Sequence, residues 1–571
     1  MPRAPRSRIA FVSGAPAADR TGGAWLWGPA PDLLLGCGLG YVLVVGALLV
    51  GSDAGWITRG APLAIALLGL VTNTPHYGAT LLRVYEARAD RRRYAFFTVY
   101  LTLALLALFV AGLHVVWIGS ALITLYISWS PWHFAGQNYG LALMFLRRRG
   151  VEVPPVAKRL LHVSFFCSFL LVLLLAHGPF QALGLFPVPS FEREVYDFLS
   201  LGLPPEPARL ALSAVALVYA GSIAGAIALL LRRARPRELA PALCLVALQA
   251  TWFSLPAALA VSGRLTFTSL ALSSVWIAFA HSLQYLWITS YYAMRQAAPQ
   301  APGSHGLPGY LLRTLAWGSA ATILPALAFA PALLGPVPFH AGLAILLFAV
   351  VNLHHFLLDG AIWKLRDGRV AAVLLRSAEP EAGRGEPIVA EGVGRLGRRA
   401  VYAVGAACVL IGFYGQCENQ TGVIGGLERG DLARVTAANE RLAWIGRESH
   451  AVHQQLGRKL AQREQWEPAR RHLERSLAIH PSVEAWYALG ELHAKRGEPD
   501  AARDALEAGL ALAPRHLPSL TLLARVSGEL GDRTRARALL EQAAALAPRS
   551  HAIRASLVRA RREEAEAAAV P

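Results

Sequence analysis

The chain has 571 residues, of which 54% are hydrophobic and only 16% are charged. This composition excludes an ordinary soluble globular protein of this length and favours a membrane protein with more than one domain. The formal net charge of +18 does not indicate nucleic-acid binding, because Lys and Arg gather in short clusters between hydrophobic segments. The five cysteines include no CxxC pair, which excludes an obvious zinc ribbon, thioredoxin motif or c-type haem attachment.

Hydrophobic segments follow one another as far as residue 415, and each has about the length that a helix needs to cross ~30 Å of hydrocarbon. Eleven can be distinguished, over residues 32–51, 60–82, 94–113, 115–146, 160–178, 208–231, 240–262, 268–293, 311–333, 340–363 and 399–415. The sequence therefore predicts an all-α chain. Residues 1–30 are expected to form a cytoplasmic tail, and residues 31–415 a polytopic transmembrane helix bundle of about 11 spans.

Basic residues predict the orientation of this bundle. Clusters such as Arg91–Arg93, Arg147–Arg149 and Arg232–Arg237 occupy alternate connections, and such clusters remain on the cytoplasmic side. With the N-terminus inside, an odd number of spans places everything after Gly415 outside. We therefore predict a multi-pass protein of a bacterial inner membrane with a periplasmic C-terminal domain; one span more or fewer would reverse that placement.

A pattern with a period of 33–34 residues begins after the last hydrophobic segment. Pro481, Pro514 and Pro548 each close a unit, and Leu456-Gly457 and Leu489-Gly490 occupy the same phase. The pattern resembles the tetratricopeptide repeat over residues 449–548, and the resemblance implies a helical solenoid over 449–571 that binds a protein or peptide partner. Residues 416–448 are expected to form a connector and a capping helix.

Histidines occur with other polar residues in four of the hydrophobic segments, within NTPHYGAT, SPWHFAGQNYG, FAHSLQYLW and NLHHFLLDG. Each segment pairs a histidine with an amide or carboxylate three or four residues away, which places both groups on one helix face. The pairs are Asn73/His76, His133/Gln137, His281/Gln284, Asn352/His355 and His355/Asp359. Polar groups at membrane depth cost several kcal/mol unless they find partners, so this repetition favours a shared site.

We predict a metal site at the point where these segments meet. The predicted ligands are His76, His133, His281, His354 and His355, with His354 either a fifth ligand or a proton carrier. Asp359 is expected beside the ligands, where it would accept a hydrogen bond from one of them. Gln137 and Gln284 would orient ligands or substrate. Hydrogen bonding between helices is the alternative explanation of the same residues.

The residue types narrow the choice of cofactor. Imidazole suits iron, copper and zinc, and no thiolate accompanies the histidines. Hydrolysis by zinc is disfavoured because no HExxH motif is present. We favour non-haem iron and leave haem and copper open.

An arrangement in which several helices contribute histidines to one metal is similar in kind to that of bacterial membrane carotene dioxygenases. It is also similar to histidine-rich membrane desaturases and hydroxylases, although their HxxxH and HxxHH boxes are absent and His354-His355 is only a fragment of one. The resemblance implies an oxidoreductase that acts on a lipid or isoprenoid-like substrate.

Two functions of other classes fit parts of the sequence. A polytopic glycosyltransferase followed by repeats would need acidic residues in the first outer loop, where Asp53 is the only one. A non-enzymatic scaffold or transporter would use the repeats to recruit a partner and the histidines to relay protons.

Overall fold

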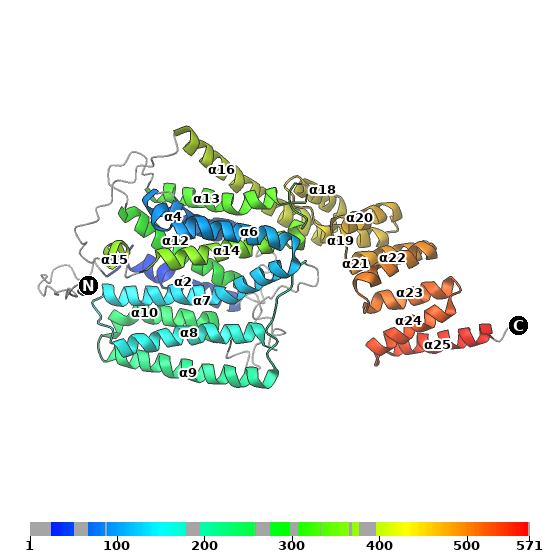
Figure 1. Cartoon of the computed structure of the whole chain (residues 1–571), viewed down its shortest axis with the longest axis horizontal. Coiled ribbons are helices and arrows are strands. Elements are labelled where there is room, and N and C mark those ends of the chain that lie inside the picture. The colour runs from blue at the N-terminus through cyan, green and yellow to red at the C-terminus, as the bar shows by residue number, and fades with distance from the viewer. Residues whose placement is uncertain are drawn as a thin grey trace, which may run out of the picture.

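Helices form all the regular secondary structure in the computed structural model. The structure describes residues 24–50, 67–85, 88–178, 195–255, 257, 274–296, 306–331, 333–364, 368–375 and 395–568, and among these residues there is no strand. A bundle of long, roughly parallel helices is followed by a row of shorter helix pairs, with α16 leading from one to the other (Figure 1). The predicted all-α fold is therefore confirmed for the described residues.

The bundle consists of helices from the first three quarters of the chain, several of which begin or end with a wider π-helical turn. They are α1 (Pro29–Pro31), η2 (Asp32–Gly36), α2 (Leu39–Val50), η3 (Gly69–Asn73), α4 (Thr74–Tyr85), α5 (Arg88–Arg93), η4 (Phe96–Leu101), α6 (Thr102–His114), α7 (Val116–Arg148), α8 (Pro155–His177), α9 (Pro205–Leu231), α10 (Pro236–Gln249), η7 (Ala250–Ser254), α12 (Ser274–Gln296), α13 (Gly306–Ala328), η8 (Phe339–Ala341), α14 (Leu343–Ile362), α15 (Gly368–Leu375) and α16 (Arg395–Cys417).

Five described helices are long and apolar enough to cross a membrane: Phe96–His114, α8, α9, α13 and α14. The bent pair Pro29–Gly36 and Leu39–Ala47 makes a sixth if it counts as one span. The predicted number of eleven is thus not confirmed. Polar and aromatic side chains lower the mean hydropathy of α7 and α12, and parts of the predicted spans 60–82, 240–262 and 268–293 lie outside the described residues.

The first predicted span is not one continuous helix. It bends by 62° between Gly36 and Leu39. Gly38 has a φ of +74°, and a Cβ there would lie 2.3 Å from a Leu248 methyl carbon, so the bend depends on a glycine. Residues 24–30, which belong to the predicted cytoplasmic tail, pack on the bundle, where the carbonyl of Trp25 accepts a hydrogen bond from Arg148. Residues 1–23 lie outside the described part of the chain.

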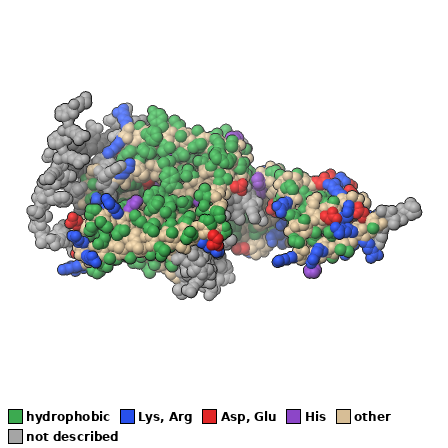
Figure 2. Space-filling model, turned by 60° about the horizontal axis from the view of Figure 1, so that its bottom comes forward, with side chains coloured by type: hydrophobic (Ala, Val, Ile, Leu, Met, Phe, Trp, Pro, Cys, Tyr) green, Lys and Arg blue, Asp and Glu red, His purple; other side chains and the backbone are tan. Residues whose placement is uncertain are grey.

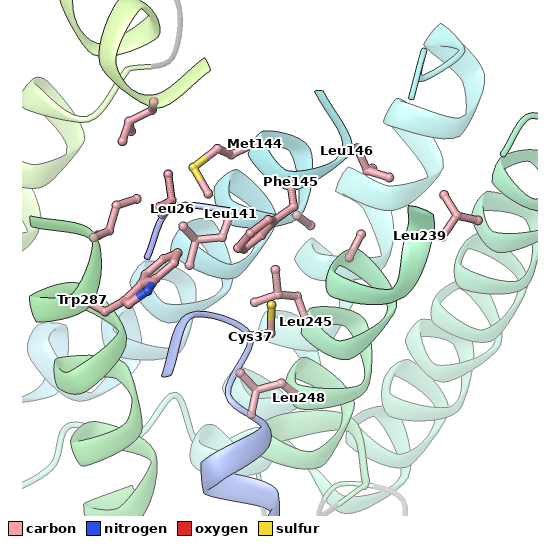
Figure 3. Close-up of a cluster of buried hydrophobic side chains, with 14 of the residues drawn as sticks. Leu26, Cys37, Leu141, Met144, Phe145, Leu146, Leu239, Leu245, Leu248 and Trp287 are labelled. Carbon is pink, nitrogen blue, oxygen red and sulfur yellow. The ribbon is translucent and has the colours of Figure 1, made fainter. Parts of the chain in front are cut away.

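A large apolar cluster joins this N-terminal segment to α7, α10 and α12. Phe145, Leu245, Leu248 and Trp287 are buried in it together with Cys37. Figure 3 shows these side chains meeting between the helices that supply them. The cluster connects α7 to α12 through side chains such as Phe145 and Trp287, and these two helices carry His133 and His281.

The closest helix crossing in the bundle joins α4 to α13. A Cβ on Gly78 would lie 1.8 Å from the carbonyl oxygen of Thr314, and one on Gly318 would lie 1.8 Å from that of Thr74. Each helix thus offers a small residue, three others and a glycine at the crossing, a pattern that lets helix backbones touch in membranes. This contact fixes the position of α4 along α13, and α4 carries His76.

Beyond α16 the chain forms a row of antiparallel helix pairs. The elements are η9 (Glu418–Ile424), α17 (Gly425–Arg429), α18 (Leu432–Ala443), α19 (His450–Gln462), α20 (Trp466–Ile479), α21 (Val483–Lys495), α22 (Pro499–Leu512), α23 (Leu517–Glu529), α24 (Arg533–Leu546) and α25 (His551–Ala568). Gly457 and Gly490 occupy equivalent places, where a Cβ would lie 2.6 Å from Leu473 and Leu506 of the following helix. The repeated phase seen in the sequence is therefore a repeated close approach of two helices.

A polar cluster ties the connector to the first of these pairs. The Nδ1 atoms of His453 and His472 lie 2.8 Å apart, and Nε2 of His453 lies 2.9 Å from a Glu448 oxygen. Arg475 donates two hydrogen bonds to the same carboxylate. Burial acts to raise the pKa of Glu448, but the hydrogen bonds from His453 and Arg475 outweigh it and lower this pKa to about 2.

We expect Gly78→Ala to destabilise the bundle by about 1–3 kcal/mol or more, because the new methyl group must push α4 away from α13. The measurement is chemical unfolding of the full chain in detergent, followed by circular dichroism. Gly140→Ala in α7 is the control, since no atom of the described residues lies within 4 Å of a Cβ at that position. Equal stability of the two variants would show that the crossing is not tight.

The pH dependence of the first helix pair follows from His472. Burial, with smaller effects of His453 and Arg471, lowers its pKa from 6.5 to about 4. As the pH falls, His472 is protonated in the unfolded chain before it is protonated in the folded chain. Its contribution to the free energy of unfolding is therefore complete above about pH 6.5 and is lost as the pH decreases toward 4.

We expect the amide protons of α19 and α20 to be less protected against hydrogen exchange at about pH 5 than at about pH 7 in the full chain, after correction for intrinsic rates. His472→Gln should remove most of that difference. His551→Gln, on an exposed residue of α25, should leave it unchanged. A wild-type difference that survives in His472→Gln would contradict the assignment.

Candidate metal centre

Four helices of the bundle each bring one histidine to a common point. His76 of α4, His133 of α7, His281 of α12 and His355 of α14 each offer a ring nitrogen that lies within 4.8 Å of the other three. The ring centroids of His76 and His355 are 4.1 Å apart, and those of His133 and His281 are 4.9 Å apart. His76, His281 and His355 are buried and His133 is half-buried.

Most ring nitrogens of this four-histidine group lack a hydrogen-bond partner among the described residues. They are both nitrogens of His76, both nitrogens of His281, and Nε2 of His133 and of His355. Leaving a buried polar atom unsatisfied costs about 1–3 kcal/mol. Histidines that only join helices have partners. A metal ion, which accepts a lone pair from each neutral imidazole, fits a group whose nitrogens face one another instead.

Aromatic rings enclose the group. The ring of Phe356 stacks on that of His133 with 4.3 Å between centroids, and the ring of Phe134 lies 4.3 Å from that of His281. Tyr285 lies edge-on to His76 at 4.7 Å. Such a wall lowers the local dielectric constant and restricts access of water, which strengthens interactions between an ion and its ligands.

The hydroxyl of Thr80 links three groups at the centre. Its Oγ1 lies 2.8 Å from Nδ1 of His355 and 2.6 Å from the hydroxyl oxygen of Tyr285, and it donates to Oδ1 of Asp359 at 3.0 Å. The contact between Thr80 and His355 is compatible with either tautomer of the imidazole. With its proton on Nδ1, the imidazole donates to Thr80, which agrees with Thr80 donating to Asp359. In that tautomer Nε2, which has no hydrogen-bond partner among the described residues, carries the lone pair and can bind a metal.

Asp359 lies beside the group, as the sequence predicts. Its Oδ2 is 3.4 Å from Nε2 of His355 and 4.0 Å from Nε2 of His133, while its Oδ1 accepts a hydrogen bond from Tyr285 at 2.7 Å. The indole of Trp363 donates in turn to the Tyr285 hydroxyl at 3.0 Å. A carboxylate in this position can balance the charge of a cation or supply an oxygen ligand.

His354, predicted as a fifth ligand or proton carrier, is not brought into the group. Its Nε2 lies 2.8 Å from the hydroxyl of Thr102 on α6. Consecutive residues of an α-helix point about 100° apart, so His354 and His355 face different neighbours. A pair of adjacent histidines on one helix cannot both reach the same ion here.

The amides predicted to accompany the histidines pair elsewhere. Gln137 donates to Oε1 of Gln284 at 2.5 Å, and Gln284 donates to the Gly36 carbonyl at 2.8 Å. Asn73 and Asn352 accept hydrogen bonds from Ser282 and Tyr77. None of these contacts involves an imidazole nitrogen of the four-histidine group, so the structure gives the amides a role in joining helices.

Sequence reasoning gave no role to the two hydroxyls that do reach the site. Thr80 and Tyr285 follow His76 and His281 by four residues, the same spacing that singled out the amides and Asp359. Threonine and tyrosine are common in membrane helices for other reasons, so spacing alone does not distinguish them.

Comparison with known proteins concerns the repeats. Residues 483–526, which cover α21 to part of α23, match the model of the tetratricopeptide repeat family. The resemblance predicted for this region is thereby confirmed there. The crystal structure of MamA protein has a TM-score of 0.25 and 20% identity, over 27% of this chain and 84% of MamA. That of YrrB, described as a TPR protein with an unusual peptide-binding site, has a TM-score of 0.22 and 19% identity, over 28% of this chain and 81% of YrrB.

No curated protein matches the sequence. The resemblance of the helical bundle to membrane iron oxygenases therefore gains no support from these comparisons, and the argument for a metal centre depends on the geometry of the four-histidine group.

We expect Thr80→Ala to weaken metal binding roughly 10- to 100-fold, the usual effect of removing a hydrogen bond that orients a ligand histidine. Thr80→Ser keeps the hydroxyl and should bind almost as the wild type does. Iron(II) is titrated into chelator-stripped protein in competition with a coloured chelator. Equal affinities of Thr80→Ala and wild type would refute this role, as would equal losses in the alanine and serine variants.

Proposed function

We propose that the chain is an integral membrane metalloprotein that binds one non-haem iron ion with His76, His133, His281 and His355. We further propose that it is an oxidoreductase acting on a lipid-soluble substrate. The observation that carries the proposal is the meeting of four imidazoles inside an apolar bundle, where six of their ring nitrogens lack a hydrogen-bond partner among the described residues.

A single ion suits this geometry better than haem. A porphyrin occupies four positions around its iron and leaves two axial positions for histidines on opposite faces. Four ring nitrogens that lie within 4.8 Å of one another leave no space for the macrocycle between them. Imidazoles with a neighbouring carboxylate and no thiolate favour iron, and copper is the second choice.

The residues of the chain perform three tasks in this proposal. The four imidazoles would bind the ion, and the Thr80 hydroxyl would accept the Nδ1 proton of His355 and leave its Nε2 for the ion. Asp359 would balance part of the charge of the ion, and the rings of Phe134 and Phe356 would restrict water. A bound iron ion would supply one-electron and oxygen chemistry. The apolar surroundings suit a hydrocarbon substrate better than a water-soluble one.

Surface charge supports a membrane location with the repeats on the outer side. Figure 2 shows hydrophobic side chains over the exposed face of the bundle, and Lys and Arg at the end away from the repeats. Large apolar residues such as Leu210, Leu217 and Val218 of α9 are more than half exposed. By the positive-inside rule the basic end would face the cytoplasm, and we therefore propose that the repeats lie in the periplasm of a bacterial cell.

The repeat domain is proposed to bind a protein or peptide. A hollow of about 160 Å³ between α19 and α21 is lined by Arg458, Gln462, Glu491 and Lys495. YrrB, a TPR protein with an unusual peptide-binding site, is similar to part of this chain. Mixed charges along the hollow favour a polar segment of a partner.

The other functions considered gain no specific support. Asp53, on which a glycosyltransferase would depend, lies outside the described residues. A proton relay through the histidines needs hydrogen-bonded neighbours along a path. The four-histidine group instead turns unpartnered nitrogens toward one another.

Elemental analysis of the full chain, purified in detergent, tests the metal site. We expect about one iron per chain in the wild type and a loss of most of it in His355→Ala, because a ligand is removed. His354→Ala is the matched control, since it changes the adjacent residue of the same helix and leaves the group intact. Metal-free wild-type protein, or an equal loss in both variants, would contradict the proposal.

A further inference from the structure

A groove of about 750 Å³ lies on the side of the bundle, apart from the metal centre. Its walls come from the N-terminal segment, the η3–α4 junction, α12 and α13. Several rim residues are exposed, among them Val71 at 55% and Leu312 at 67% of their surface. The residues that line it are Trp27, Pro31, Leu35, Val71, Pro75, Leu283, Leu286, Trp287, Ser290, Leu307, Pro308, Leu311, Leu312 and Leu315.

The polar side-chain groups of this lining are already bound within the protein. The Trp27 indole donates to the carbonyl of Trp287 at 3.1 Å, and the Trp287 indole donates to Asp32 at 3.0 Å. The hydroxyl of Ser290 donates to the carbonyl of Trp287 at 3.0 Å. The side chains therefore offer no free donor to a head group, and the groove suits hydrocarbon alone.

One wall of the groove is held in place by a buried carboxylate. Asp32 is fully buried and accepts hydrogen bonds from the backbone N–H groups of Leu26 and Trp27 at 2.6 and 3.1 Å. With the indole of Trp287 it receives three donors, which compensates for burying a polar group among apolar helices. These bonds fix Trp27 against α12 at the rim.

The groove and the metal centre share two helices. Pro75 of the groove precedes His76, and Leu286 of the groove follows Tyr285. On α12, Leu283, Leu286 and Ser290 face the groove, while His281 and Tyr285 face the four-histidine group. A hydrocarbon chain in the groove would thus be separated from the four-histidine group by α12.

We propose that this groove binds a long, unsubstituted hydrocarbon chain that enters sideways from the bilayer, as the acyl or isoprenoid part of the lipid-soluble substrate. The volume lies within the range of small-molecule pockets, and the rim of the groove exposes large apolar side chains such as Val71 and Leu312. The inference rests on the proposed membrane location and substrate class, and it does not depend on which metal is bound.

Photolabelling of the full chain tests this assignment. The protein is reconstituted in vesicles of phosphatidylcholine and phosphatidylglycerol with a 16-carbon alkyl diazirine that has no polar head group. After illumination, labelled peptides are quantified by mass spectrometry. We expect α12 and α13 peptides that line the groove to be labelled several-fold more than the α9 peptide around Leu217, which is 75% exposed on the bundle surface.

Filling the groove provides the matched comparison. Leu283→Trp and, independently, Leu312→Trp should lower groove labelling to the level of α9, whereas Leu217→Trp should not. The iron content of all three variants should equal that of the wild type. The labelling result does not depend on iron, so a metal-free wild type would overturn the proposed metal centre and leave the proposed hydrocarbon site standing. Equal labelling of groove and α9 in the wild type, or undiminished labelling in both groove variants, would overturn the proposal.

Discussion

Four imidazoles meet in an apolar interior, and most of their nitrogens have no hydrogen-bond partner in the described chain. Each such nitrogen is unfavourable by itself, so the bundle must hold the rings together by contacts elsewhere. The α4–α13 crossing at Gly78 and Gly318 fixes α4, which carries His76. The apolar cluster around Phe145 and Trp287 fixes two more. Thr80 joins α4 to α14 directly through His355.

The connector to the repeats touches the same framework. The guanidinium of Arg447 lies 4.6 Å from the ring of Phe339, and Gly446 approaches Ala330 so closely that a Cβ there would lie 2.7 Å from it. Phe339 belongs to the short helix η8 that leads into α14, the helix of His355 and Asp359. The connector to the repeats is therefore in contact with the segment that leads into the helix of His355 and Asp359.

The sequence identifies the four histidines of the group because each lies in its own hydrophobic segment with a polar residue on the same helix face. The sequence does not show that His354 lies outside the group, because the direction of this side chain depends on how α14 is rotated against α6. For the same reason the amides at Gln137 and Gln284 were predicted beside imidazoles, whereas they bond to one another across α7 and α12. Side-chain partners across a helix interface are set by packing, and spacing along one helix does not contain that information.

The number of spans was harder to predict for a related physical reason. Helices that bury a polar site need fewer apolar residues, since neighbouring helices shield them from lipid. This explains why α7 and α12, which carry polar residues of the histidine group, are too polar to be recognised as spans by hydropathy. The repeats were easier to predict from the sequence than the spans. Small residues such as Gly457 and Gly490 recur at a fixed interval, because the two helices of each pair must approach closely there.

X-ray absorption at the iron edge of the purified full chain tests the central claim most directly. The account predicts about four imidazole nitrogens bound directly to one iron, with the multiple-scattering signal of intact rings. A spectrum with two or fewer imidazoles per iron, or with the scattering pattern of a porphyrin, would contradict the account.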